Sequence, residues 1–302
     1  MTDLPLSFTP EVREALDAGR PVVALESTII THGMPHPRNL DMAREVERVV
    51  RDAGAVPATI AVIGGRIRIG LDDATLEHLA GAEGVMKISR ADLAVCLTSG
   101  RTGATTVAAT MICAALAGIR VFATGGIGGV HRNVGETMDI SADLYELAAT
   151  PVTVVCSGAK AILDLPRTFE FLETLGVPVI AVGQDEIPAF WSRDSGLPAP
   201  LRLDDPAQIA AAARMRRTLG LPGGQLVVNP IPAEAEIPRA DIFPAVKRAL
   251  EEATRKRIAA KAVTPFLLDR VHDLTQGRSL DANIALVLAN ARLAAEIAAQ
   301  DA

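Results

Sequence analysis

Cysteine and concentrated positive charge are both scarce in this sequence. Three cysteines occur in 302 residues, and each lies in an apolar segment without the spacing typical of a metal site. We expect buried free thiols in a reducing compartment at Cys96, Cys113 and Cys156. The formal net charge is −6, and glutamates dilute the basic run near residue 250. This charge pattern disfavours binding to nucleic acid through its phosphate backbone.

Signals for export or membrane insertion are weak. The N-terminal residues lack the basic start and the apolar core of a signal peptide. Residues 102–119 carry no charge and equal a short membrane span in length, but they are rich in threonine, alanine and glycine. A helix buried inside a soluble protein fits this composition better. We therefore expect a cytoplasmic protein that does not bind membranes.

Short β-branched segments alternate with helical patterns along most of the chain. This alternation predicts an α/β fold with a mostly parallel sheet and helices on both faces. No polar linker or internal repeat divides the chain, which predicts a single domain over residues 1–302. The expected strands are 22–25, 59–63, 93–97, 119–123, 152–156, 177–182 and 225–228, and the expected helices are 11–17, 39–53, 105–117, 142–149, 160–175, 206–219 and 240–262.

The segment from Gln184 to Leu203 breaks this alternation. It contains several prolines and the only tryptophan, Trp191. The composition predicts a long ordered loop. Such loops in compact domains often serve as lids or binding loops, although a plain connection explains the same composition.

Two ionisable residues follow apolar strands. Lys160 comes after the strand 152–156 and a short turn, and Glu26 comes directly after the strand 22–25. In open α/β sheets, ligands bind outside the carboxyl ends of the strands. A lysine there either holds a phosphate or attacks a carbonyl as an uncharged amine. A glutamate there is either exposed at an edge, or partly buried with a raised pKa that suits a general acid or base.

A glycine-rich turn follows the strand 119–123 and ends at His131. Glycines let backbone amides approach an anion, but they also permit close packing, and both interpretations stay open. The dinucleotide fingerprint fails because His131 takes the place of its third glycine. The P-loop pattern fails as well, because no Gly-Lys-Ser/Thr follows.

Ser141 is predicted to cap the helix 142–149. The first amides of that helix, those of Ala142 and Asp143, could hold a phosphate, and Asp139 could then hold a hard cation beside it. The alternative gives Asp143 only a favourable place in the helix dipole.

For Lys87, Val107 and Asn283, the residue patterns alone favour a structural role or leave it open beside ligand binding. Lys87 follows an apolar pair and is typical of a surface lysine whose stem packs on the protein. The helix start next to Val107 offers amides that either bind an anion or are capped by side chains. Asn283 lies in a C-terminal helix among apolar residues, where a buried hydrogen bond is the simplest expectation.

Taken together, these segments resemble the pseudouridine-5′-phosphate glycosidases, the indigoidine synthase A-like family. The resemblance spans roughly residues 20 to 290 in the family's order, and long motifs in a fixed order are far more specific than a glycine pattern. The matching segments are ALESTIITHGMPHPRN, ATIAVIGGRIRIGL, SRADLAVCLTSGRTGATTVAATM, VFATGGIGGVHR, DISADL, VVCSGAKAILDLPRTFEFLETLGVPV and SLDANIAL.

The resemblance implies a homotrimeric three-layer α/β/α enzyme with a mixed sheet and a manganese ion (Mn²⁺). It implies reversible cleavage of pseudouridine 5′-phosphate to uracil and ribose 5-phosphate. Lys160 matches the nucleophile, Glu26 the proton donor and Asp139 the metal ligand. The positions that match substrate-binding residues are Lys87, Val107, Ser141, Ala142 and Asp143, with His131 and Asn283 near the base and the sugar.

The implied chemistry explains why an amine is needed. In a C-glycoside, C1′ is joined to a ring carbon that has no lone pair to protonate, so the acid-assisted departure used for ordinary glycosides is poor. Opening the ribose ring lets an amine capture C1′ as an imine. Two other functions stay open: another imine-forming phosphosugar lyase, and a non-catalytic sensor of sugar phosphates.

Overall fold

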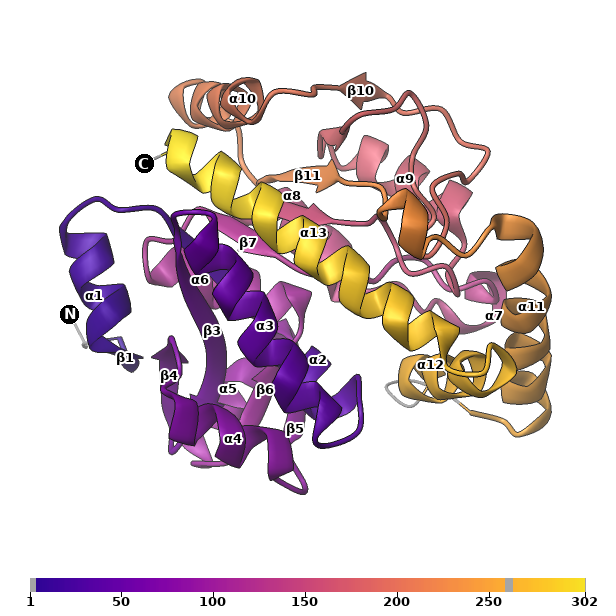
Figure 1. The fold of residues 1–302 in the computed structure, drawn as a ribbon, viewed down its shortest axis with the longest axis horizontal. Helices are drawn as coiled ribbons and strands as arrows, with labels where there is room; N and C mark the ends of the chain where they lie inside the picture. Colours follow the sequence, from indigo (N-terminus) through magenta and orange to yellow (C-terminus); the bar gives the residue numbers. More distant parts are fainter. Residues whose placement is uncertain (1–3, 259–262, 302) are drawn as a thin grey trace.

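The computed structural model describes residues 4–258 and 263–301, and Figure 1 shows their arrangement. Within this part of the chain, the strands form one sheet in which β3 pairs antiparallel with β4 and β6, and the other pairs are parallel. The sheet order is β1 (Leu6–Phe8), β4 (Arg66–Ile69), β3 (Val56–Ile63), β2 (Val22–Leu25), β7 (Val121–Ala123), β8 (Thr153–Cys156), β11 (Gln225–Val228), β9 (Val179–Ala181) and β10 (Leu201–Arg202), while β5 (Met86–Ile88) pairs with β6 (Gly103–Thr105).

Helices cover both faces of this sheet. The long helix α13 (Arg278–Asp301) crosses the front of the view in Figure 1 and packs on α3 (Arg38–Asp52) and α10 (Pro206–Thr218). Helices α6 (Val107–Leu116) and α8 (Ala142–Ala149) pack together behind the sheet. The prediction of a three-layer fold with a mixed, mostly parallel sheet is therefore confirmed. The remaining helices are α1 (Pro10–Asp17), α2 (Thr28–His32), α4 (Asp73–Gly81), α5 (Arg90–Thr98), α7 (Val134–Thr137), α9 (Leu165–Thr174), α11 (Arg239–Arg255) and α12 (Val263–Leu274), with a 3₁₀ turn η1 (Ala233–Ala235).

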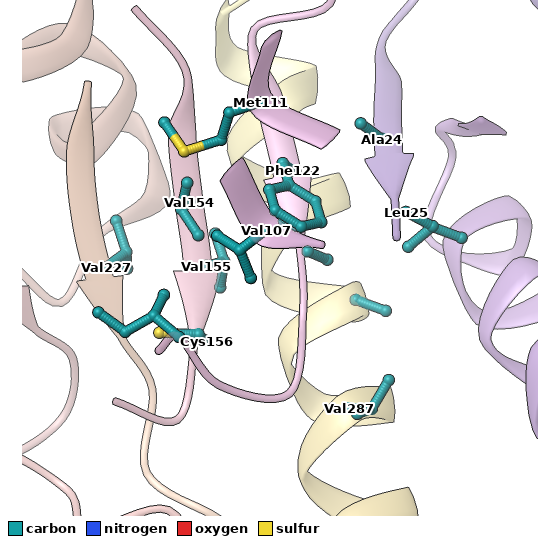
Figure 2. Packing of buried hydrophobic residues seen from close by; sticks show 14 of the residues in the cluster. Ala24, Leu25, Val107, Met111, Phe122, Val154, Val155, Cys156, Val227 and Val287 are labelled. Atoms are coloured by element: carbon teal, nitrogen blue, oxygen red, sulfur yellow. The ribbon is translucent and has the colours of Figure 1, made fainter. Parts of the chain in front are cut away.

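The burial of the central strands explains why they could be predicted from the sequence. Every residue of β2, β8 and β11 is buried, because helices cover the sheet on both sides. Figure 2 shows Val154 of β8 and Phe122 of β7 packed near Met111 of α6, while Val287 projects from α13. Strands buried in this way appear as continuous apolar runs rather than alternating patterns.

One predicted strand is wrong. Residues 93–97 lie inside the helix α5, whose start is fixed by a hydrogen bond of 3.0 Å from the Ser89 amide to the Asp92 carboxylate. Leu93 and Cys96 point inward three residues apart, while Val95 is exposed. A short apolar run cannot by itself distinguish a strand from a buried helix.

Two helix boundaries also differ from the prediction. Helix α9 begins at Leu165, so Lys160 lies in the turn that precedes it rather than at the helix start. Helix α11 ends at Arg255, and the last part of the predicted helix, 259–262, lies outside the described residues. Pro166 in the first turn of α9 and the Asp164 side chain that caps it account for the late start, because both residue types are favoured at a helix N-terminus.

Within the described residues, α13 is the one helix long and apolar enough, by length and composition, to cross a membrane. Of its most apolar window, 56% is buried inside the protein. The core helix of a soluble protein passes the same test, so this signal is weak. The uncharged segment 102–119 contains β6 and the buried helix α6, as its composition suggested.

Candidate active site

Three polar side chains meet at the carboxyl edge of the sheet. Glu26 directly follows β2, Thr124 follows β7, and Lys160 lies in the turn after β8. These strands are parallel neighbours in the order β2–β7–β8. Their ends therefore open on the same edge, where ligands bind in open α/β sheets.

A pocket at this edge brings several of the predicted site residues together. It has a volume of about 580 Å³ when the space open to solvent is included. Its lining includes Glu26, Lys87 and Lys160 together with Phe190 and Asn283. The rest of its wall is mostly apolar and comes from α2, α12 and α13.

The surroundings of the Glu26 carboxyl raise its pKa. Burial raises the pKa of Glu26, and the charge of Lys160 and a hydrogen bond from the Thr124 hydroxyl partly offset that rise. The nearby charge of Asp143 adds to the raised pKa, and Lys87 opposes it. A desolvated carboxyl with one hydroxyl partner is suited to exchange protons with a ligand.

Lys160 is anchored through its backbone and leaves its amine to the pocket. Its amide donates to the Ile127 carbonyl oxygen at 3.1 Å, and Ala159 bridges to Ile127 in parallel register. The residue is half-buried. Among the described residues, the Lys160 amine forms no ion pair within 4.0 Å of a carboxylate. An amine placed in this way remains available to a ligand.

The glycine-rich turn is shaped by close packing. A Cβ atom added to Gly126 would lie 2.7 Å from the Phe190 ring, and one added to Gly129 would lie 2.7 Å from Cγ2 of Thr168. A Cβ on Gly128 would overlap Ser141. Close packing therefore explains why glycine occupies these three positions, without anion binding.

Asp143 uses its carboxylate to hold the surrounding backbone. It is 6% exposed, its Oδ1 accepts from the Ala108 amide at 2.9 Å, and its Oδ2 accepts from the Gly128 amide at 2.8 Å. Its own amide donates to the hydroxyl of the N-cap Ser141 at 3.2 Å. Asp143 thus ties α8 to α6 and to the glycine-rich turn, a role larger than the dipole interaction considered from sequence.

Two amides at these helix starts remain available. Within the described residues, no hydrogen bond reaches the amides of Val107 and Ala142, which are the first residues of α6 and α8. The two helix starts are joined by the bond from Ala108 to Asp143. Free amides at adjacent helix N-termini favour an anion.

His131 and Asp139 form a pair of ionisable side chains near the site. The Nε2 atom of His131 lies 3.8 Å from the Asp139 carboxylate, which is partly exposed. Burial lowers the pKa of His131, Asp139 opposes this, and the charges of Lys160 and Lys87 lower the pKa further. His131 therefore belongs to the same electrostatic neighbourhood as both lysines.

A metal held by protein ligands alone does not fit this group. No cluster of three or more His, Cys, Asp or Glu side chains suited to a metal occurs within residues 4–258 and 263–301. A single, partly exposed carboxylate such as that of Asp139 does fit a hard cation that keeps most of its waters.

Buried residues that the sequence did not reveal support the site. Asn290 of α13 is fully buried and donates to the Thr124 carbonyl oxygen at 2.9 Å and to the Ser157 hydroxyl at 3.1 Å. It therefore ties together the ends of β7 and β8, which carry Thr124 and lead to Lys160. Its only sequence signal is the spacing of seven residues from Asn283, which places both on one face of a helix.

The cysteines take no part in this chemistry. Cys96, Cys113 and Cys156 are free and buried, as predicted. Burial raises the pKa of the Cys113 thiol and that of Cys156 to about 12. A thiol with such a pKa is not a nucleophile at neutral pH.

Comparison with known proteins identifies the family. Residues 11–300 match the family described as indigoidine synthase A like protein. The chain belongs to this family. It is 73% identical over 296 residues to a pseudouridine-5′-phosphate glycosidase of Paracoccus denitrificans, covering 97% of each chain. It is 68% identical over 295 residues to one of Jannaschia sp., covering 98% of each.

Two solved structures share the fold. A prealnumycin C-glycosynthase in complex with ribulose 5-phosphate superposes with a TM-score of 0.92 at 40% identity, covering 100% of this chain and 98% of that one. An indigoidine synthase A-like protein of Thermotoga maritima gives 0.89 at 34% identity, covering 98% and 96%. The predicted resemblance to this family is confirmed.

Proposed function

We propose that this protein is a pseudouridine-5′-phosphate glycosidase, which reversibly cleaves pseudouridine 5′-phosphate to uracil and ribose 5-phosphate. Relatives at 73% and 68% identity over nearly the whole chain carry that name. The observation that carries the proposal is the single pocket that holds both Glu26 and Lys160. A desolvated carboxyl beside a lysine amine is the pair that this reaction needs.

In the proposed mechanism the Lys160 amine attacks C1′, and the ring oxygen leaves with a proton from Glu26. The attached nitrogen then loses a proton to the Glu26 carboxylate, which restores its lone pair. The lone pair forms a C=N bond to C1′, the electron pair of the C1′–C5 bond moves into the uracil ring, and C5 takes up the proton that Glu26 now carries. Water hydrolyses the imine, which releases ribose 5-phosphate and restores the amine.

The phosphate is proposed to bind at the starts of α6 and α8. The free amides of Val107 and Ala142 would donate to it together with the Ser141 hydroxyl, and Lys87 would supply positive charge on the sheet side. Binding at a distance from the reacting bond would hold the open-chain sugar in place. Asp143 would act indirectly, by keeping the two helix starts together.

Asp139 is the proposed ligand of a manganese ion that keeps several of its waters. Such an ion would supply positive charge beside the sugar phosphate. We expect Asp139→Asn to weaken Mn²⁺ binding at least tenfold, because it removes the charged ligand. Titration with Mn²⁺ followed by electron paramagnetic resonance measures this without reference to turnover, and unchanged affinity would place the ion elsewhere.

We further propose a single-domain, cytoplasmic homotrimer that binds neither nucleic acid nor membranes. The core supports the first part, because one cluster of buried hydrophobic residues runs through the sheet and both helical layers. Analytical ultracentrifugation tests the trimer, for which a monomeric or dimeric mass would be contrary evidence.

Release of free uracil tests the function itself. The protein incubated with pseudouridine 5′-phosphate and Mn²⁺ should release equal amounts of uracil and ribose 5-phosphate. Another imine-forming lyase would react with phosphosugars without releasing uracil. A sensor would bind the nucleotide in a single-turnover experiment and leave it intact.

A further inference from the structure

The loop from Gln184 to Leu203 contributes Phe190 to the lining of the pocket. Phe190, which has a positive φ of 65°, lines the pocket and packs on the glycine-rich turn. Its amide donates to the Ser157 carbonyl oxygen at 3.0 Å, in the turn that leads to Lys160. The next residue, Trp191, is 1% exposed and meets the Phe190 ring edge to face at 5.1 Å. This segment is therefore a fixed part of the site.

Trp191 makes a specific contact with Asn283. Its indole N–H donates to Oδ1 of Asn283 at 2.6 Å and also lies 3.2 Å from the Ser279 carbonyl oxygen. An indole nitrogen can only donate a hydrogen bond, so the Asn283 carboxamide must turn its oxygen toward Trp191. Its NH₂ group then points away from the indole. Among the described residues, no hydrogen bond reaches that NH₂ group.

The orientation matters because Asn283 lines the pocket that contains Glu26 and Lys160. An asparagine free to flip could present either an acceptor or a donor to a ligand. Held by Trp191, it directs its oxygen toward the indole and leaves its NH₂ donors as the group available to a ligand. A pocket with a fixed donor accepts a carbonyl oxygen and rejects an amino group, because two donors that face each other both lose their hydrogen bonds.

We propose that Trp191 is a positioning residue that sets the base specificity of the site. It fixes the Asn283 carboxamide so that its NH₂ group donates to a carbonyl oxygen of the pyrimidine. A base with an amino group at that position is then excluded. The inference rests on the proposed function, since it concerns the base released or captured at this pocket.

Competition between bases in the reverse reaction tests the inference. The experiment measures how strongly cytosine and isocytosine compete with uracil in its condensation with ribose 5-phosphate, since each carries an amino group in place of one uracil carbonyl. For the wild type, we expect one of the two to bind weaker than uracil by on the order of ten- to a hundredfold. Trp191→Phe keeps an aromatic ring but removes the N–H, so this ratio should fall at least about fivefold.

The ratio of the affinities for uracil and for the amino-bearing base distinguishes loss of the Asn283 orientation from a general structural defect. A partly unfolded variant would lose activity toward all bases alike and keep the ratio. The KM for ribose 5-phosphate should stay near its wild-type value, because the proposed phosphate site at the starts of α6 and α8 does not include Trp191. An unchanged ratio in folded Trp191→Phe, or a wild type that does not discriminate between the bases, would overturn the proposal.

Asn283→Asp supplies a second test that does not disturb the loop. The aspartate keeps an acceptor for the indole N–H and replaces the NH₂ group with a second acceptor. The preference should therefore invert toward the amino-bearing base, and a wild-type ratio in this variant would reject the role of the NH₂ group. A wild type that fails to condense uracil at all would instead reject the proposed function, so the two failures are distinguishable.

Discussion

The sheet edge and the starts of α6 and α8 satisfy their polar groups in opposite ways. At the sheet edge, Glu26 is desolvated with one hydroxyl partner, and Lys160 is held only through its backbone. At the helix starts, both carboxylate oxygens of Asp143 accept backbone amides. A carboxylate saturated by fixed amides holds structure together, whereas a desolvated one with few partners can exchange a proton. The two kinds of residue should therefore respond differently to substitution.

Lys160→Ala should have the largest effect on rate. Removing the nucleophile should slow uracil release at least about 10⁴-fold, the size of loss seen when a covalent nucleophile is deleted. Stability should change little, because the Lys160 amine has no carboxylate partner among the described residues. Calorimetry should still detect ribose 5-phosphate binding through its phosphate. Turnover near the wild-type rate would remove Lys160 from the mechanism.

Glu26→Gln should reduce cleavage by roughly 10²- to 10⁴-fold, the usual contribution of a general acid or base. Steady-state assays of uracil release measure this loss. The variant should fold normally, since glutamine keeps an acceptor for the Thr124 hydroxyl. Wild-type cleavage would show that the proton comes from another group.

The same variant makes a prediction about stability and pH. Because burial raises the pKa of Glu26, the folded protein binds a proton at this site more tightly than the unfolded chain. The free energy of unfolding therefore falls as pH rises from the unfolded pKa through the raised folded pKa. Glu26→Gln should gain stability relative to wild type over this range, and the two should converge below about pH 4. Urea titrations of both proteins at several pH values measure this. A difference in the free energy of unfolding that stays constant with pH would contradict the raised pKa of Glu26.

Asp143→Asn should mainly affect stability and substrate binding. The asparagine has one acceptor where two amides need one each, so a buried amide loses its partner at a cost of about 1–3 kcal/mol. The starts of α6 and α8 should then be held together less firmly. As a result, the KM for the phosphorylated substrate should rise more than kcat changes. Urea denaturation and steady-state kinetics measure the two effects. A loss confined to kcat would place Asp143 among the reacting groups.

Thr124→Val should give the smallest change. It removes the hydroxyl that lowers the pKa of Glu26, so that pKa should rise further. The pH midpoint of the rate that depends on Glu26 should shift upward, and the optimal rate should fall by about two- to tenfold. A shift toward lower pH would contradict the hydrogen bond to Glu26.

The sequence predicted the parts of the molecule that depend on local patterns. Fully buried strands such as β8, the Ser141 cap and the positions of Glu26 and Lys160 after their strands follow from nearby residues. The helix α5 was mistaken for a strand because its apolar run is too short to show a period. Family resemblance added the expected roles of the site residues, which local patterns had left open.

Contacts between distant segments were beyond the reach of sequence patterns. The hydrogen bond from the Ala108 amide to Asp143 joins residues 35 positions apart, and the one from Trp191 to Asn283 spans 92. Neither residue pair has a recurring spacing, because each depends on how α8, α13 and the loop pack in three dimensions. For the same reason, sequence alone suggested no role for Asn290.

The spacing of Asn283 and Asn290 along α13 limits which insertions and deletions this helix can tolerate. These residues lie two helical turns apart, one facing the pocket and the other bonded to the strand ends beneath it. Inserting one residue between them would rotate one against the other by about 100°. Only one of the two could then keep its partner, so the length of this short segment is restricted as strictly as the identity of the two asparagines.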